Sequence, residues 1–245
     1  MPKDKNYLSK PELFMLDLLD GYQWDRPIHM LSQGGEINIG QKDYLMYEGF
    51  SSVFVPIRNK ITSKSLGLVD VDKLCDRIDN VYTWDALKRT DYCVDYQNLY
   101  TFLGVVPQRE IFLNAANLLL DNGDTARAEA MLDKAQACVP AESFPLESIC
   151  LGFYHNDIVV IGMVEAYYKA GAIDKARALA DRIGEQLLTS TGFFIEYYDI
   201  AKNDFEMCCN CFYYLADTLK LYGDKDRSDA LMDRLTGLMK IDADS

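Results

Sequence analysis

The chain has 245 residues, of which 49% are hydrophobic and 12% aromatic, so it can build a packed core and is not intrinsically disordered. It carries 25 Lys and Arg against 38 Asp and Glu, which gives a formal net charge of −13. This charge disfavours duplex nucleic acid and anionic lipid as partners, because both would repel the chain at long range. No apolar run approaches the roughly 18 residues of a membrane-spanning helix. The first residues do not have the pattern of a signal peptide, so we expect a soluble chain.

The N-terminal hundred residues predict a small α/β module. Ser9 is the expected N-cap of a first helix, with Pro11 in its first turn and Gly21 at its end. Two short apolar runs, Ile28–Leu31 and Ser51–Ile57, predict two strands.

Helices are expected between and after these strands. Residues 43–49 have a helical pattern, so strand, helix and strand together have the size of one βαβ unit. After a polar loop at 61–68, Asp70 or Asp72 is expected to cap a further helix.

An aromatic, irregular connector at 83–106 is expected to pack on the helices that follow it. We place a domain boundary near Tyr100. The predicted domains are an α/β entry module with its connector at 1–100 and a helical-repeat region at 101–245.

The helical-repeat region opens with a two-helix unit at 110–140. Apolar residues recur at helical spacing on both sides of a turn at Gly123, where glycine supplies the backbone freedom that a tight reversal needs. The two apolar faces consist of Phe112, Ala115, Ala116, Leu119, Ala128, Leu132 and Ala135. Such a unit cannot bury its apolar face alone, so we expect further units stacked on it.

The pattern of this unit occurs three times. The glycines at 123, 171 and 223 are each followed by a basic residue four positions later and a small residue five positions later. This pattern is typical of tetratricopeptide repeats, although the glycines are further apart than the about 34 residues of that repeat. We place the surplus in loops or extra turns at 141–156 and 189–204. The predicted fold class is mainly α, with degenerate tetratricopeptide-like repeats after the two-strand α/β module.

The seven cysteines do not form the pattern of a disulfide framework, because their number is odd and their spacing irregular. Cys208 and Cys211 continue a helical apolar stripe through Phe212, Leu215 and Leu219. We interpret them as buried thiols, because a soft-metal site would need a second cysteine or histidine pair at matching spacing.

No residue pattern indicates catalysis. His29, in the first strand, and His155, in a loop between repeats, lack neighbours in sequence that would mark a triad or a metal site. Asp70 and Asp72 could share a divalent cation. Carboxylates at the start of a helix more often accept its unpaired backbone N–H groups. We therefore expect no catalytic residue, no bound metal and no cofactor.

The candidate site is the concave groove that the first helices of such an array line. Counting from the three glycines places Asn117, Glu165 and Asp217 at equivalent positions there, with Tyr168 and Tyr213 close by. Tyr168 and Tyr213 belong to two of the three tyrosine pairs, which are Tyr167–Tyr168, Tyr197–Tyr198 and Tyr213–Tyr214. In each pair one ring should pack inside and the other face outward. The resulting groove is acidic and aromatic, which suits a neutral or basic peptide or a glycan-bearing partner.

Short motifs of the entry module resemble a known family. They are Trp24, Arg26-Pro27-Ile28, Ile39-Gly40, Tyr44, Glu48-Gly49 and Val55-Pro56-Ile57. These motifs are similar to the segment after the last membrane span in a family of large bacterial membrane proteins that is frequent in Bacteroidetes. That family has a multi-spanning part of the GT-C glycosyltransferase type and is related to the animal transmembrane protein O-mannosyltransferases, whose C-terminal part carries tetratricopeptide-like repeats.

The resemblance implies a parent protein that uses a lipid-linked sugar donor and keeps its catalytic acidic residues in the membrane-spanning part. This chain would then be a soluble, non-catalytic C-terminal domain at the periplasmic face, which positions an acceptor or stabilises the membrane part. The cysteines favour a reducing compartment instead, so a cytoplasmic location stays open. The alternatives are a free-standing adaptor that binds a peptide in its groove and an enzyme that uses Asp70 and Asp72 on a sugar.

Overall fold

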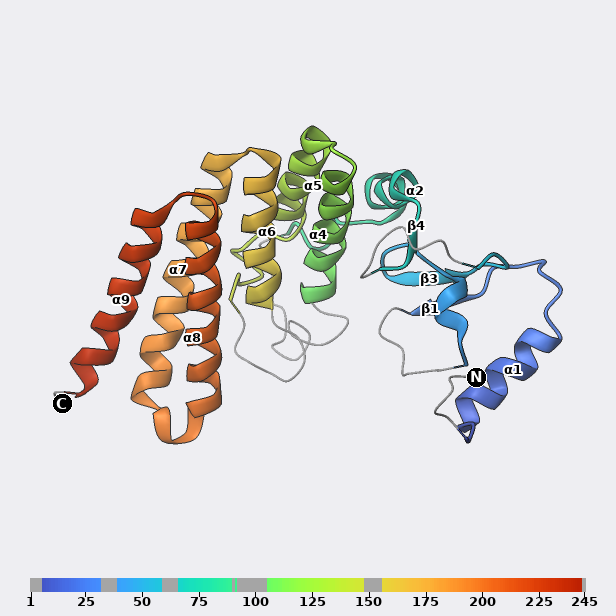
Figure 1. Cartoon of the computed structure of the whole chain (residues 1–245), viewed down its shortest axis with the longest axis horizontal. Helices are drawn as coiled ribbons and strands as arrows, with labels where there is room; N and C mark the ends of the chain where they lie inside the picture. The colour runs from blue at the N-terminus through green and yellow to red at the C-terminus, as the bar shows by residue number, and fades with distance from the viewer. Residues whose placement is uncertain are drawn as a thin grey trace. The chain divides into compact units, whose positions relative to one another are not determined.

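The computed structural model describes residues 6–31, 39–58, 66–89, 91, 105–147 and 156–243. The chain is mainly helical, with a small four-stranded sheet near the N-terminus, which confirms the predicted fold class (Figure 1). Internal contacts divide it into two compact units, Met1–Tyr82 and Thr83–Ser245. The boundary that we expected near Tyr100 lies outside the described residues.

The first unit begins with helix α1 (Lys10–Asp20), whose start is the predicted one. The backbone N–H of Ser9 donates to Glu12 Oε2 over 2.8 Å, and the Ser9 hydroxyl donates to the same oxygen over 3.0 Å. Pro11 lies in the first turn, and Gly21 follows the last helical residue. The capping box therefore fixes the helix start as the sequence indicated.

The sheet of the first unit has two more strands than predicted. Its order is β1-β3-β2-β4, with β1 (His29–Leu31) and β2 (Leu45–Tyr47) antiparallel to β3 (Ser51–Phe54) and β4 (Leu68–Val69) parallel to β2. The expected helix at 43–49 is wrong, because only the 3-10 turn η1 (Gln41–Tyr44) is helical there.

The expected βαβ unit is consequently wrong as well. Gly49, at φ +103, forms the tight turn that lets β2 pair with β3 as an antiparallel hairpin. The run Leu45–Tyr47 is too short for its periodicity to distinguish a strand from a helix. The polar loop expected at 61–68 lies partly outside the described residues, and its last residue opens β4.

Asp70 caps the next helix, as predicted. Its carboxylate accepts the backbone N–H of Lys73 over 3.0 Å at the start of α2 (Val71–Asp76). The helix continues into a π-helical turn, η2 (Arg77–Val81). Leu74 and Ile78 are buried on the inner face of this segment.

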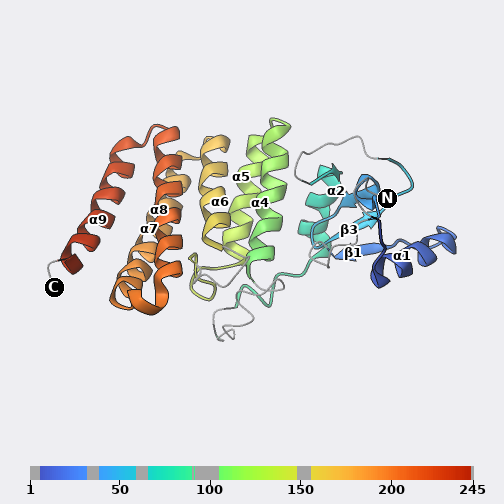
Figure 2. The same cartoon turned by 60° about the horizontal axis from the view of Figure 1, so that its bottom comes forward.

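The second unit is an array of helices that lie side by side in chain order (Figures 1 and 2). Its described helices are α4 (Val105–Asp121), α5 (Thr125–Cys138), α6 (Asn156–Ala170), α7 (Ile173–Glu196), α8 (Tyr198–Leu221) and α9 (Lys225–Ala243). The seven apolar residues predicted for the faces of α4 and α5 are all buried. From the connector, Trp84 packs on Phe112 with ring centroids 4.6 Å apart, and residues 92–104 lie outside the described part of the chain.

The three predicted reversals share one geometry. Gly123, Gly171 and Gly223 have φ angles of +79, +82 and +89, in the left-handed region that favours glycine. At the first turn, Gly123 N–H donates to the Leu120 carbonyl and Asp124 N–H to the Leu119 carbonyl, each over 2.9 Å. Equivalent bonds form at the other two turns, so each helix pair is closed by a Schellman motif.

The positions where each helix pair closes are buried, and all but Val164 carry small side chains. Ala116 and Ala128 are fully buried in the first pair, and so are the equivalent residues of the other two. Ser228, which stands where the pattern favours alanine, donates its hydroxyl to the Ala216 carbonyl over 2.8 Å, so its polar group is satisfied. The assignment of this array to the tetratricopeptide class stays a prediction.

Of the two alternatives for the surplus at 189–204, a loop or extra turns, the structure has extra helical turns. Both segments around Tyr197 are helical, because α7 and α8 each have 24 residues and meet there. Phe194, Ala201 and Cys208 form a small core between the extended ends. Of the other surplus segment, residues 141–147 are non-helical, and 148–155 lie outside the described residues.

Candidate functional site

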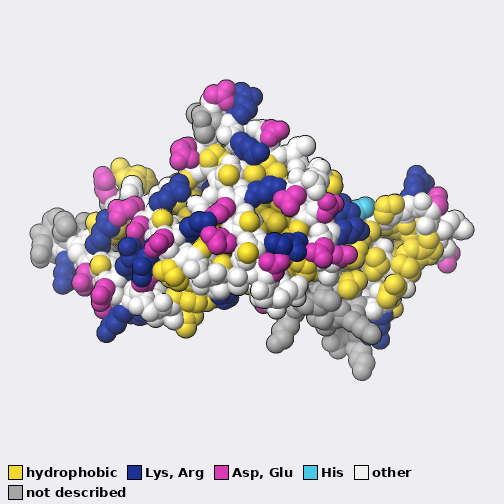
Figure 3. Space-filling view, turned by 90° about the horizontal axis from the view of Figure 1, so that it is seen from above, with side chains coloured by type: hydrophobic (Ala, Val, Ile, Leu, Met, Phe, Trp, Pro, Cys, Tyr) yellow, Lys and Arg dark blue, Asp and Glu magenta, His cyan; other side chains and the backbone are white. Residues whose placement is uncertain are grey.

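The basic residues that follow the turns are used within the array. Lys175 Nζ lies 2.6 Å from Asp133 Oδ2, and Arg227 donates to Asp181 Oδ1 over 2.6 Å. Arg234 pairs with Glu185 in the same way. The bonds join α5 to α7 and α7 to α9, and Figure 3 shows Lys and Arg side chains alternating with Asp and Glu over the array. Exposed pairs of this kind contribute little stability. They balance the charges of α5, α7 and α9, which are the second helices of the three pairs.

The first helices α6 and α8 carry a cluster that we name the α6–α8 surface: Glu165, Lys169, Tyr214 and Tyr222. Glu165 accepts from Lys169 Nζ over 2.9 Å and from the Tyr222 hydroxyl over 3.4 Å. Glu165 stays partly exposed, so it combines a negative charge with two neighbouring aromatic rings. A cationic or amide group of a peptide could bind there.

The electrostatics of this surface centre on Glu165. Burial raises the pKa of Tyr214 and of Tyr222, and the negative charge of Glu165 adds to both effects. Burial is the largest single effect and lowers the pKa of Lys169, but the hydrogen bond that Lys169 donates to Glu165 and the nearby negative charge together outweigh it, so the pKa is raised. At neutral pH the ring hydroxyls are therefore neutral donors and Lys169 is charged.

The structure brings only some of the predicted groove residues together. Tyr213 and Asp217 are exposed one turn apart on α8, adjacent to Tyr214. Asn117 is half-buried on α4. Tyr168 is only 4% exposed and lies in the last turn of α6. That these residues contact a partner stays a prediction.

Lys169, Tyr214 and Tyr222 were not among the predicted groove residues. Lys169 lies four residues after Glu165, and that spacing could have identified it as a helical neighbour. No signal in the sequence identifies the two tyrosines, because their proximity to Glu165 depends on how α8 packs on α6.

The predicted arrangement of the tyrosine pairs is wrong. Tyr167 and Tyr168 are both buried, whereas both members of the other two pairs are exposed. Tyr167 is held by Gln136, which donates to its hydroxyl over 2.8 Å, and donates in turn to Asp133 over 3.0 Å. A tyrosine whose hydroxyl has such hydrogen-bond partners can be fully buried. The helical periodicity of apolar residues therefore did not predict which tyrosines are buried.

Tyr168 belongs to a network that joins the second helix pair to the third. Its ring stacks on Tyr222 with centroids 4.9 Å apart, and its hydroxyl donates to Asp224 over 2.5 Å. Arg177 donates to both Asp224 oxygens, over 2.8 and 2.5 Å. The Arg177 guanidinium lowers the pKa of Asp224 to about 2, so the carboxylate is ionised at neutral pH.

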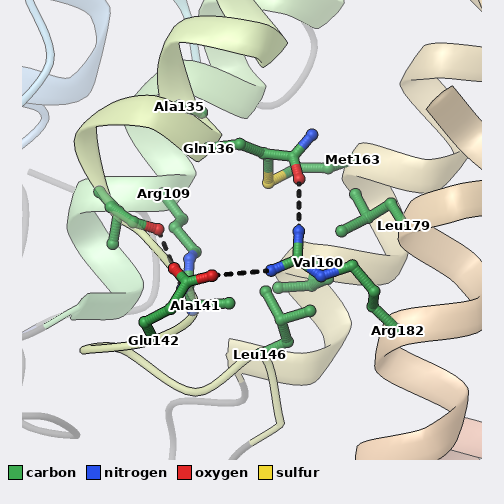
Figure 4. A pocket seen from close by; sticks show the side chains of 11 residues that line it. Arg109, Ala135, Gln136, Ala141, Glu142, Leu146, Val160, Met163, Leu179 and Arg182 are labelled. Carbon is green, nitrogen blue, oxygen red and sulfur yellow. Dashed lines mark hydrogen bonds and ion pairs between the residues drawn. The ribbon is translucent and has the colours of Figure 1, made fainter.

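A cavity of about 160 Å³ lies among α4, α5, α6 and α7 (Figure 4). Arg182 reaches across it toward Gln136 and Glu142, over 3.4 and 4.0 Å. The cavity is smaller than the about 300–1,000 Å³ of typical ligand sites, so we do not interpret it as the binding site.

Arg109, beside this cavity, is 2% exposed and has a structural role. Its guanidinium donates to the carbonyls of Pro145 and Phe144 over 2.8 and 2.5 Å and to Asn156 Oδ1 over 2.9 Å. The contacts tie the segment after α5 to α4 and to the start of α6.

In the first unit, the Glu48-Gly49 motif has a structural explanation. Glu48 is 3% exposed, with Lys73 Nζ and an Arg77 nitrogen each 2.6 Å from its carboxylate. Tyr82 donates its hydroxyl to the Glu48 carbonyl over 2.6 Å. A Cβ at Gly49 would lie 2.9 Å from that hydroxyl, so glycine is required by both space and φ. His29, in β1 as predicted, lies 3.9 Å from the same carboxylate.

The other candidate chemistry has structural explanations. The described cysteines are all thiols, and Cys208 and Cys211 are buried as predicted, with Cys211 donating to Asp157 on α6. Asp70 caps α2, and the described residues contain no group of three or more His, Cys, Asp and Glu that could hold a metal. His155 lies outside the described residues.

The family model of TMEM260-associated domain 2 matches residues 1–73. This span contains all the motifs on which the resemblance rests, from Trp24 to Ile57, and ends within α2. The match fits a TMEM260-like family, which is related to O-mannosyltransferases. No curated protein and no solved structure matches the chain. None of its described helices is long and apolar enough to cross a membrane.

Proposed function

We propose that this chain is a non-catalytic interaction domain of a TMEM260-like membrane protein, in which it positions an acceptor protein or stabilises the membrane-spanning part. The family match over 1–73 is the observation that carries this proposal. The helical array supports the interaction role in this proposal, because arrays of paired helices use extended surfaces for binding. In this proposal the parent is of the GT-C type found in Bacteroidetes, the array is tetratricopeptide-like, and the domain faces the periplasm.

The partner in this proposal is a neutral or basic peptide, or the peptide part of a glycan acceptor, bound along α6 and α8. Glu165 and Asp217 supply negative charge there, and Tyr213, Tyr214 and Tyr222 supply aromatic surface. Lys175 and Arg227 of the second helices are engaged in ion pairs with Asp133 and Asp181, whereas Asp217 is exposed on the first helix α8.

A display library of random peptides on the full-length chain tests this proposal. We expect enriched sequences to carry Lys or Arg next to aromatic or apolar residues. Replacing Glu165→Gln and Asp217→Lys together should weaken binding of a selected peptide about tenfold at low salt. Glutamine is chosen at 165 because a lysine there would face Lys169. Asp229→Lys, at an exposed position on α9, is the control.

Enrichment of acidic peptides would contradict the proposal, and so would binding that the double variant leaves unchanged. The alternative function is a free-standing cytoplasmic adaptor with the same groove. One observation favours it: the five described cysteines are thiols, which are more usual in a reducing compartment.

A further inference from the structure

The α7–α8 hairpin is longer than the pattern of the array requires. α7 and α8 have 24 residues each, whereas α5 has 14 and α6 has 15. The difference of nine or ten residues adds about 15 Å to each helix. In Figure 1 the end at which α7 meets α8 extends beyond the nearby ends of α6 and α9. Insertions in repeat arrays often lie on the binding face.

This extension is ordered by contacts of its own. Phe194, Ala201 and Cys208 are buried between the two helices, and Phe205 packs against them. Because its inner face is packed, the hairpin end is a folded part of the array from which the outer side chains project.

Four large apolar side chains are exposed at this end, which we name the hairpin tip: Phe193, Tyr197, Tyr198 and Ile200. Their exposed fractions are 55%, 43%, 42% and 86%. Phe193 and Tyr197 have ring centroids 4.7 Å apart, so two of these residues form one surface and not two scattered contacts. Clustered exposed apolar residues mark interaction sites, whereas single ones are ordinary.

The charges around the hairpin tip are mostly negative. Glu196 and Asp199 are exposed beside it, and Asp204 follows one turn later. The nearest lysine, Lys202, lies 3.8 Å from Glu206, so its charge is balanced locally. An aromatic centre with a charged rim is the usual composition of a protein-binding hot spot.

We propose that the hairpin tip docks into a concave apolar pocket of another protein, whose rim carries Lys or Arg. Charge complementarity selects this occupant. An anionic bilayer would repel the carboxylates, and a second copy of this chain would place like charges opposite each other. The hairpin end is convex, so the pocket has to be supplied by the partner.

This surface is independent of the groove proposed above. Asp217 lies on the same helix but roughly 25 Å from Asp199, at 1.5 Å per residue. Loss of binding at the groove should therefore leave binding at the hairpin tip unaffected, and the reverse. Variants at each surface can test the two proposals separately.

Photo-crosslinking of the full-length protein in its native cells tests the proposal. A benzophenone amino acid replaces Tyr198 or Ile200 in two variants, and Asp229 in the control. We expect one discrete adduct with a different protein at 198 and 200 and none at 229. Mass spectrometry of the adduct should place the crosslink in a partner segment of net positive charge.

Charge variants complete the test. Asp199→Lys with Asp204→Lys should lower the adduct yield about tenfold. The matched change Asp226→Lys with Asp229→Lys on α9, and the groove variant Glu165→Gln with Asp217→Lys, should leave the yield unchanged. The proposal is overturned by an adduct of twice the chain mass, by a lipid adduct, by an acidic partner segment or by no adduct. A yield that the Asp199 and Asp204 substitutions do not change overturns it as well.

Discussion

The glycines at the three turns are the residues that set the geometry of the helical array. Gly171 has φ +82, and no atom lies within 4 Å of where its Cβ would be, so backbone strain alone opposes a substitution. We expect Gly171→Ala to lower the free energy of unfolding by about 1–2 kcal/mol. Gly192→Ala is the matched control: this glycine is inside α7 with open space around it, so alanine should stabilise by about 0.5–1 kcal/mol. Urea unfolding of both variants measures the difference, and equal effects would contradict the strained turn.

Asp224 links stability to pH. Its pKa falls from 3.8 to about 2 on folding, because Arg177 and Tyr168 donate hydrogen bonds to the ionised carboxylate. A lowered pKa stabilises the fold above the unfolded value, and this contribution is lost as pH falls from about 4 to about 2. Asp224→Asn should therefore lower the urea midpoint at pH 7, and the deficit should shrink toward pH 2. A deficit that is the same at both pH values would exclude the ion pair as its cause.

Arg109 shows how a buried guanidinium stabilises the backbone around it. Arg109→Met leaves the carbonyls of Phe144 and Val139 without this donor, at about 1–3 kcal/mol for each buried acceptor. We expect a total loss of at least about 3 kcal/mol, measured by chemical unfolding. Arg182→Met, at an exposed arginine beside the same cavity, should change stability by no more than about 0.5 kcal/mol. Similar losses for the two variants would contradict the structural role of Arg109.

At the scale of the elements, the hairpin end should depend on its inner face and not on its outer one. Phe194→Ala removes a buried ring and should cost about 3–5 kcal/mol. Phe193→Ala, at the neighbouring exposed residue, should cost less than about 1 kcal/mol. Thermal unfolding of the two variants compares them, and a larger loss at 193 would show that the hairpin tip is part of the core.

The helices and turns of the array were predictable because their signals are local. Gly123, Gly171 and Gly223 mark the reversals through a backbone conformation that other residues rarely adopt. The cap at Asp70 follows from its own chain neighbourhood in the same way.

Elements and sites that depend on distant contacts were not predictable. β2 is a strand only because it pairs with β3 and β4, which its three residues do not reveal. At 189–204 the sequence left open whether the surplus forms a loop or extra turns, because the core of Phe194, Ala201 and Cys208 that orders it joins two different helices. In the candidate site, Glu165 was identified by counting from glycine, whereas Tyr214 and Tyr222 reach it only through helix packing.

At the scale of the whole molecule, the two units should respond separately to substitution. Glu48 lies between Lys73 and Arg77 in the first unit, and Glu48→Gln removes both ion pairs at a cost of about 1–3 kcal/mol. Hydrogen exchange should become faster in β2, β3 and α2 and stay unchanged in α4 to α9. Faster exchange throughout both units would contradict their separation.

The central claim is that this chain acts as a domain of a TMEM260-like membrane protein. An antibody raised against the chain, used on fractionated native cells, tests it most directly. We predict a membrane-bound band much larger than the 27.9 kDa of this chain, and protease added from the periplasmic side should digest the epitope. A band of 27.9 kDa that remains in the supernatant would contradict the claim and favour the free-standing adaptor.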